Sequence, residues 1–467
     1  MRRYRILWSM AAAVLVSSCA VNPPPPAQEI RKQALPNIAL DGAWRADSSI
    51  STELVQDDWI KSFDDPVLDS LVREAIANNP DLRVAGARVE QAAQYLVVAR
   101  SGLLPSLSIF GTGGAKSGGG GDTSSALQGV LLAASWELDL WGRLRYARNA
   151  AEQDLAAARA DLEFARQSLA ALTAKSWFTA TQLSLDAAVA TQMVQSANEL
   201  SVLAQQRERV GAGTDADTAV ARATAKEVES TLQQIQLSRG QALRALELLI
   251  GRYPAAEIAA RADLLARPGP VTAGMPLQML ERRPDVIAAE RRVAAAFNRV
   301  GEAKAARLPQ LTLNASFGAF ESEILQLRED FENPTGGIGA RLLAPIYQGG
   351  ALTAKVEIRT LQQKEAVADY ARVALRAIGE VENAVAANTT LAARASLLGD
   401  ALNEQTLALD LTQTRFRIGR ADRRAVEQQR LTVSNARMAL NSVRTDELAG
   451  RVNLHLALGG SFAAAAQ

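Results

Sequence analysis

Asn79-Pro80-Asp81-Leu82 reappears 204 residues further along the chain as Arg283-Pro284-Asp285-Val286. Leu103-Leu104-Pro105-Ser106-Leu107 reappears at the same offset, as Arg307-Leu308-Pro309-Gln310-Leu311. A chance match would not keep its register across both pairs, so the repeat predicts two homologous halves of about two hundred residues each.

Later matches keep the same order. Arg209-Val210-Gly211 corresponds to Arg417-Ile418-Gly419, and Ile250-Gly251 corresponds to Leu458-Gly459, both at an offset of 208. The two halves are predicted at residues 58–270 and 271–467.

In each half, the spacing of the apolar residues changes along the chain from a helical pattern to a strand pattern, in the same order. Proline suits the first turn of a helix and its Asn and Asp neighbours can cap it, so an alanine-rich helix is predicted from Pro80 to Ser101, with Pro105 preventing its continuation. Apolar and polar residues then alternate, which is typical of a half-buried strand. The alternation predicts one β-hairpin per half, at about residues 104–141 and 308–347.

Long helices are predicted after the strands. Leu155, Leu162 and Leu169 recur every seventh residue, which indicates a coiled-coil seam in a helix of roughly 100 Å. Glycines at the two turns allow the helices to reverse. Long helical hairpins are therefore predicted at about residues 143–250 and 350–458.

The strands have the pattern of a transmembrane β-barrel, being apolar on one face and polar on the other, with aromatic residues near their ends. A strand of a soluble sandwich would alternate in the same way, but the helical remainder of each half leaves no room for a second sheet. Four strands cannot close a barrel, so the chain must oligomerise. Two copies would give eight strands with a filled interior, whereas three would give twelve and a water channel. The predicted lumen residues are Ser106, Ser108, Glu137, Asp139, Thr312, Asn314 and Arg341.

Composition excludes several classes of function. Cys19 is the only cysteine and His455 the only histidine, which argues against disulfide frameworks, thiolate metal sites and imidazole catalysis. His455 is interpreted as an ordinary helix residue. Lysine plus arginine (51) nearly balance aspartate plus glutamate (50), so the chain has no large net charge of the kind that would indicate binding to nucleic acid. No catalytic residues, metal ligands or cofactors are predicted.

A signal peptide is predicted at residues 1–18. A basic start and an apolar run lead to Val16-Ser17-Ser18-Cys19, the pattern of a bacterial lipoprotein signal, in which the thiol of Cys19 is acylated. The alternative is an ordinary signal peptide with a stray cysteine. Ala20 leaves no retention signal for the inner membrane, so an outer-membrane location is expected. Residues 19–57 are predicted to be extended.

Taken together, these features resemble the TolC-like outer-membrane factors, in the NodT-like lipoprotein branch. The resemblance rests on Cys19, the two Pro-Asp helix starts, the two Leu-Pro strand entries, Trp136-Glu137-Leu138-Asp139-Leu140-Trp141-Gly142 and Ala344-Pro345-Ile346-Tyr347-Gln348-Gly349-Gly350. It covers essentially the whole mature chain. The fold that it implies is a homotrimer with a twelve-stranded β-barrel continued by a twelve-helix periplasmic α-barrel.

The resemblance also implies partners. Such a duct receives small molecules, such as drugs, from an inner-membrane pump of the resistance-nodulation-division type through a periplasmic adaptor protein. The implied adaptor contacts at the helical turns are Val210, Gly211, Ala212, Ile418, Gly419 and Arg420. Turn geometry alone would also explain the two glycines, although exposed Val and Ile at a tip otherwise lack a reason.

A gate at the tip is a further implication of the resemblance. The candidates are Asp215, Asp217, Arg417 and Asp422, together with Arg420. Asp215 and Asp422 are equally interpretable as helix caps, and the two roles are compatible.

Other functions remain open at this point. A duct for type I protein export would share the fold. A periplasmic adaptor or structural lipoprotein also contains helical hairpins, but normally has a lipoyl-like β-domain between them. An envelope enzyme lacks a set of nucleophile, histidine and acid in this sequence.

Overall fold

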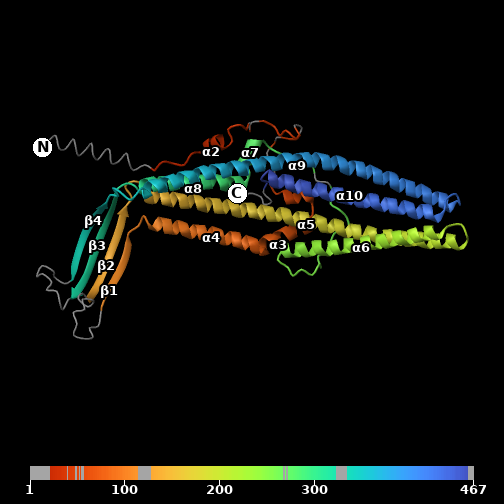
Figure 1. The fold of residues 1–467 in the computed structure, drawn as a ribbon, viewed down its shortest axis with the longest axis horizontal. Coiled ribbons are helices and arrows are strands. Elements are labelled where there is room, and N and C mark those ends of the chain that lie inside the picture. The colour runs from red at the N-terminus through yellow and green to blue at the C-terminus, as the bar shows by residue number, and fades with distance from the viewer. Residues whose placement is uncertain are drawn as a thin grey trace. The chain divides into compact units, whose positions relative to one another are not determined.

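The structure is a computed structural model that describes residues 21–460 except 39, 41, 48–49, 52, 54–56, 114–127, 267–268, 270–271 and 322–333. Figure 1 shows the order of its elements along the chain. The helices are α2 (Ala27–Ala34), the 3-10 helix η1 (Trp59–Phe63), α3 (Pro66–Asn78), α4 (Pro80–Ser101), α5 (Arg143–Arg209), α6 (Asp215–Leu249), α7 (Pro276–Arg282), α8 (Pro284–Ala305), α9 (Ala351–Arg417) and α10 (Arg423–Ala457). The strands are β1 (Ser106–Thr112), β2 (Gln128–Leu138), β3 (Gln310–Glu321) and β4 (Thr335–Leu343).

The long elements match in length, pair by pair. Helices α4 and α8 each have 22 residues, α5 and α9 each have 67, and α6 and α10 each have 35. Helices α5 and α6 together span Arg143–Leu249, and α9 and α10 span Ala351–Ala457, where the sequence predicts helical hairpins at about residues 143–250 and 350–458. None of the helices in the described residues is both long and apolar enough to cross a membrane.

Two strands end before the alternation in the sequence does. The alternation in sequence continues to residues 140 and 346, but β2 ends at Leu138 and β4 at Leu343. The segment at residues 19–57 is also not extended throughout, because Ala27–Ala34 forms helix α2 with the side chain of Ile30 buried.

The chain divides into two compact units. One consists of the described parts of residues 1–37, 87–160 and 288–373, and contains the sheet. The other consists of the described parts of residues 38–86, 161–287 and 374–467, and contains both helical turns. Each unit takes residues from both halves of the sequence.

The sheet of the first unit has four antiparallel strands in the order β1-β2-β3-β4, with β1 and β4 at its edges. Its register places Leu107, Ala134, Ala315 and Ile338 in one row across the strands. This face is apolar but exposed: 69% of Leu107 and 92% of Ile338 are accessible. The hydrophobic residues of the sheet therefore do not pack into a core of the single chain.

The core of the second unit lies where α3, η1 and α5 meet the ends of α6 and α10. Trp59, Trp177 and Phe178 are buried there. Trp177 Nε1 donates a hydrogen bond to Asp65 Oδ2 at 2.9 Å, and Asp65 also caps α3 by accepting from Val67 N at 3.0 Å. A buried carboxylate thus connects the start of one helix to the middle of another.

The chain before η1 is held against this unit at Trp44. Its indole Nε1 donates to the carbonyl of Gly274 at 3.0 Å, and its side chain is buried. The next two backbone N–H groups, of Arg45 and Ala46, donate to the carboxylate of Glu382 on α9 at 3.0 and 2.7 Å.

Candidate functional site

Both helical turns have the same backbone. Gly211 and Gly419 have φ angles of 70° and 74°, in the left-handed region that glycine adopts without steric cost. The N–H of Ala212 donates to the carbonyl of Arg207 at 2.8 Å, and the N–H of Arg420 donates to that of Arg415 at 2.7 Å. This is the Schellman arrangement, which satisfies the last carbonyls of a helix.

The predicted adaptor-contact residues lie on these turns, which Figure 1 shows at the same end of the second unit. Val210 is 77% exposed and Ile418 is 61% exposed. A Cβ added at Gly211 or Gly419 would meet no atom within 4 Å. The turns therefore present bare backbone beside one exposed apolar side chain each, and their contact with an adaptor stays a prediction.

Two of the acidic gate candidates, Asp217 and Asp422, take part in helix capping. Asp217 forms a capping box with Thr214: its Oδ2 accepts from Thr214 N at 3.0 Å, and Asp217 N donates to Thr214 Oγ1 at 3.1 Å. These hydrogen bonds lower the pKa of the exposed Asp217 carboxyl. Asp422 caps α10 by accepting from Ala425 N at 2.8 Å. Thr214, rather than Asp215, is the N-cap of α6, so the cap interpretation of Asp215 is wrong.

Within the described residues, the remaining gate candidates form hydrogen bonds with neighbours in the sequence. Asp215 Oδ1 accepts from the N–H of Ala216 at 2.9 Å. Arg417 Nη2 donates to Thr414 Oγ1 at 3.0 Å. A gate role for Asp215, Asp217, Arg417 or Asp422 stays a prediction.

The predicted lumen residues share one face of the sheet, with one exception. Ser106 pairs with Ser135, which pairs with Asn314, while Glu137 pairs with Thr312 and Thr312 with Arg341. Ser108 lies two residues along β1 from Ser106 and so points to the same side.

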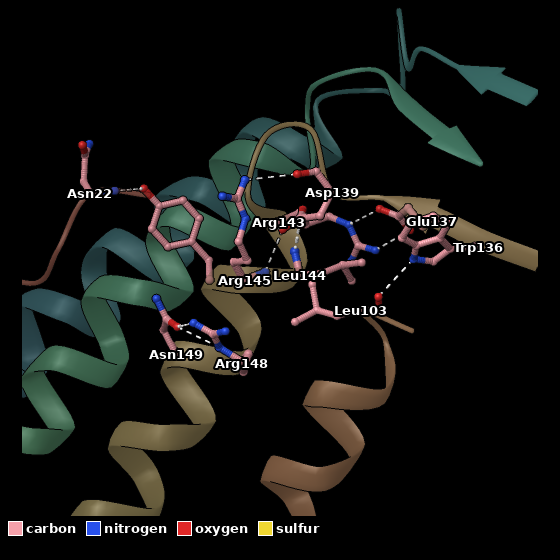
Figure 2. A network of polar contacts seen from close by, with 11 residues as sticks. Asn22, Leu103, Trp136, Glu137, Asp139, Arg143, Leu144, Arg145, Arg148 and Asn149 are labelled. Atoms are coloured by element: carbon pink, nitrogen blue, oxygen red, sulfur yellow. Dashed lines mark hydrogen bonds and ion pairs between the residues drawn. The ribbon is translucent and has the colours of Figure 1, made fainter. Parts of the chain in front are cut away.

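The exception is Asp139, which lies beyond the end of β2. Its two carboxylate oxygens accept the backbone N–H groups of Leu144 and Arg145, both at 3.0 Å, in the first turn of α5 (Figure 2). Glu137, the last acidic residue of the strand, forms an ion pair with Arg143 at 2.7 Å. The charge of Asp139 is therefore used at a helix start, where unpaired N–H groups favour an anion, and its place in a lumen stays a prediction.

Two tryptophans anchor the same end of the sheet. Trp136 Nε1 donates to the carbonyl of Leu103 at 3.0 Å (Figure 2), and Trp141 Nε1 donates to that of Pro309 at 2.7 Å. Trp141 thus joins the first hairpin to the proline that precedes the second.

Sequence reasoning missed a buried charge on α10. Only 1% of the Glu427 side chain is exposed, and it accepts from Ser196 Oγ at 2.9 Å and from Arg423 Nε at 3.0 Å. The spacing of Arg423 and Glu427 at i and i+4 was the available signal, but burial cannot be read from it.

The predicted lipid attachment site, Cys19, and the signal peptide at residues 1–18 lie outside the described residues. The described residues contain no group of three or more His, Cys, Asp or Glu that could hold a metal. His455 is buried and stacks on Trp59, with ring centroids 5.8 Å apart, so it is part of the core.

Comparison with known proteins defines the class. The family model described as outer membrane efflux protein matches residues 71–252 and 275–460, and the chain belongs to this family. It is an outer-membrane efflux channel. The match has two segments, one in each half of the sequence.

Individual proteins agree with this class. The chain is 30% identical over 445 residues to the pyoverdine export outer membrane protein OpmQ of Pseudomonas putida, covering 91% of this chain and 93% of OpmQ. The structure of the outer-membrane channel OprN is similar with a TM-score of 0.78 and 25% identity, over 91% of this chain and 99% of OprN. The CmeC channel of Campylobacter jejuni has the same fold, with a TM-score of 0.81 at 23% identity over 94% of each chain.

Proposed function

We propose that three copies of this chain form the outer-membrane exit duct of a tripartite efflux system. The four strands of each copy would close a twelve-stranded barrel, and the long helices would continue it as a twelve-helix periplasmic tunnel. The duct is a passive conduit: an inner-membrane pump loads small molecules such as drugs, and a periplasmic adaptor connects pump and duct. A lipid on Cys19 anchors each chain.

The observation that carries this proposal is the exposed sheet. Its two edge strands have unpaired backbone groups, which cost several kcal/mol each in lipid unless another chain pairs with them. One face is apolar and exposed, and the opposite face carries serine, threonine, asparagine, glutamate and arginine. Copies joined edge to edge would turn the apolar face to lipid and the polar face to water.

The matched element lengths support a duplication of the chain. A trimer of duplicated chains has six similar units around its axis, so that each turn type would recur three times at the tip. Cryo-electron microscopy of the purified protein in lipid nanodiscs tests the trimer. Three copies with β1 of one paired to β4 of the next are expected, and a closed monomeric sheet would contradict the proposal.

Adaptor contact at the tip is tested by cross-linking. With Cys19 acylated, a cysteine introduced as Val210→Cys or Ile418→Cys would be the only free thiol of the mature chain. We expect both variants to cross-link to an adaptor in cells. Leu237→Cys, 53% exposed in the middle of α6, is the matched control and should not cross-link. Equal cross-linking at all three positions would remove the tip from the proposal.

The gate role of Asp422 is tested by measuring how much of a large antibiotic leaks into cells. If Asp422 belongs to a gate, Asp422→Ala should increase the entry of a large antibiotic that the closed outer membrane excludes. Unchanged entry with a lower melting temperature would leave only the capping role.

A further inference from the structure

An arginine recurs at every seventh position of α10: Arg423, Arg430, Arg437, Arg444 and Arg451. Seven residues are two helical turns, so these side chains lie on one side of the helix in steps of roughly 10.5 Å. The first four are exposed and Arg451 is buried. The apolar seam of α10, Val426, Val433 and Leu440, repeats with the same period and is buried.

Three of these arginines line one cavity. Arg423, Arg430 and Arg437 border a cavity of about 530 Å³ between α10, α5 and α9. Helix α5 contributes the amides of Gln192 and Gln195 to its wall. All of the lining residues belong to the second unit.

The negative charges in the cavity wall are already engaged. Glu427 is buried and holds Arg423 at 3.0 Å and Arg430 at 3.2 Å. The second carboxylate of the wall, Glu199, lies 3.7 Å from Arg423. Arg437 forms no ion pair with any carboxylate of the described chain.

A coiled-coil explanation accounts for only part of this pattern. Charged residues that flank a seam usually pair with opposite charges of the facing helix. Here the facing helix supplies Glu199 beside Arg423, but glutamines along the rest of the wall. Arg430 has N–H donors other than those on the nitrogen that binds Glu427. All five N–H donors of Arg437 are available to a ligand.

We propose that this cavity binds a soluble organic anion with more than one carboxylate, sulfonate or phosphate group. Guanidinium groups bind such groups through paired, charge-assisted hydrogen bonds. The glutamine amides and the Ser434 hydroxyl of the wall supply further donors. Its volume is within the range of small-molecule sites. Only the origin of the ligand depends on the proposed duct: the anion would be a cargo that passes through it.

The test uses the purified full chain and 8-hydroxypyrene-1,3,6-trisulfonate, a fluorescent trianion, by fluorescence anisotropy. We expect saturable binding that weakens with added salt and is absent for the cationic dye rhodamine 6G. Arg437→Gln should weaken binding about tenfold, the loss of one charge-assisted contact. Arg437→Lys keeps the positive charge but cannot form the paired hydrogen bonds of a guanidinium. It should weaken binding of the trianion less than Arg437→Gln does.

Arg444→Gln is the matched control, because Arg444 belongs to the same row on α10 but does not line the cavity. The affinity of the Arg444→Gln protein for the trianion should stay within about twofold of wild type, whereas that of the Arg437→Gln protein should fall about tenfold. Equal weakening by both variants would overturn the site, since general surface charge would then explain the binding. Absence of saturable binding to the wild-type chain would overturn it as well.

A second variant changes affinity in the opposite direction. Glu427→Gln keeps the shape of the side chain but removes the charge that holds Arg423 and Arg430, so the trianion should bind more tightly. Circular dichroism confirms that this variant is folded before binding is measured. Weaker binding by a folded Glu427→Gln protein would contradict the proposal.

The inference and the proposed function can fail separately. If cells without the chain keep wild-type resistance to every compound while the trianion binds as expected, the duct proposal fails and the site stands. If the chain restores resistance but Arg437→Gln leaves trianion affinity unchanged, the site fails alone.

Discussion

Two junctions in the second unit have the same backbone but different side-chain chemistry. The first junction joins the end of α6 to the start of α4, and the second joins the end of α10 to the start of α8. At the first, Asn79 Nδ2 donates to the carbonyl of Leu249 at 3.0 Å. At the second, Arg283 Nη1 donates to the carbonyl of Ala457 at 3.1 Å. An uncharged amide and a buried guanidinium therefore make the same connection in the two halves.

The second junction needs additional charges because Arg283 is buried. Its side chain is 2% exposed and forms ion pairs with Asp285 at 2.8 Å and Glu380 at 2.7 Å. The nearby carboxylates keep the pKa of Arg283 above its ordinary value even though burial opposes the charge. The comparison shows that one backbone connection can depend on capping alone or on a charge network, and the two should respond differently to mutation.

The largest effect is expected at Arg283. Arg283→Met removes the nearer of the two arginines that pair with buried Asp285, leaving Arg376 at 3.4 Å, and breaking a buried pair costs up to about 3–5 kcal/mol of the free energy of unfolding. Asn79→Ala removes capping hydrogen bonds at the first junction and should cost about 1–2 kcal/mol. Thermal unfolding in detergent, followed by circular dichroism, measures both.

Arg282→Ala is the control for this comparison. Arg282 is the neighbour of Arg283, but its ion pair with Asp57 is partly exposed, so a loss below about 1 kcal/mol is expected. Equal losses for Asn79→Ala and Arg283→Met would mean that the charge network adds nothing to the connection.

As the pH is lowered, the second junction should lose stability at a higher pH than the first. Burial, with a smaller contribution from Arg451, lowers the pKa of His455 from 6.5 to about 4. The unfolded chain then binds a proton that the folded chain does not, so stability is full above pH 6.5 and falls as the pH decreases toward 4, by about 3 kcal/mol in total. His455→Phe should keep the stacking on Trp59 and remove this slope.

The equivalent position at the first junction is Glu247, which is also buried. Burial opposes its charge, but backbone N–H groups, including that of Ala256 at 2.6 Å, outweigh burial and lower the pKa of Glu247 below 4.5. Its contribution is present above pH 4.5 and is lost only at lower pH. Glu247→Gln should therefore leave the slope between pH 6.5 and 4.5 unchanged, and a change there would contradict the assignment to His455.

Glycine substitutions separate the junctions from the turns. Gly251, Gly459, Gly211 and Gly419 all have positive φ, so alanine costs about 1–2 kcal/mol at each. At Gly251 a Cβ would also lie 2.9 Å from Asn78 Cβ, and at Gly459 it would lie 3.1 Å from Arg283 N. Gly251→Ala and Gly459→Ala should lower the unfolding midpoint more than Gly211→Ala and Gly419→Ala, which meet open space. Similar losses at all four would show that the junctions relax around the added methyl group.

Smaller effects than at the junction glycines are expected at the caps of the two turns. Thr214→Ala and Asp422→Ala each remove a side-chain acceptor at a helix start and should cost about 1 kcal/mol. Unfolding midpoints measure both, with Asp422→Asn as the control that keeps the acceptor and loses the charge. A much larger loss in either variant would indicate a role beyond capping.

The sequence predicts the repeating parts of this fold well, because they depend on local patterns. Heptad leucines and paired glycines locate the long helices and their turns, and alternation locates the strands. The end of β2 cannot be predicted in this way, because the alternation continues through Asp139 while its carboxylate binds the N–H groups of the next helix. The network of Arg283 with Glu380 joins residues 97 positions apart, which no local pattern indicates. The period of the arginines on α10 is visible in the sequence, but the shortage of acidic partners is visible only in the folded chain.

Drug susceptibility is the sharpest test of whether the chain is an outer-membrane exit duct. A strain that lacks the chain would be complemented with wild type, with Cys19→Ser and with a Gly211→Pro/Gly419→Pro double variant. Deletion should sensitise the cells to several unrelated compounds, and wild type should restore resistance. The double variant should fail to restore it while still forming trimers. Unchanged susceptibility of the deletion strain to every compound would contradict a role in efflux.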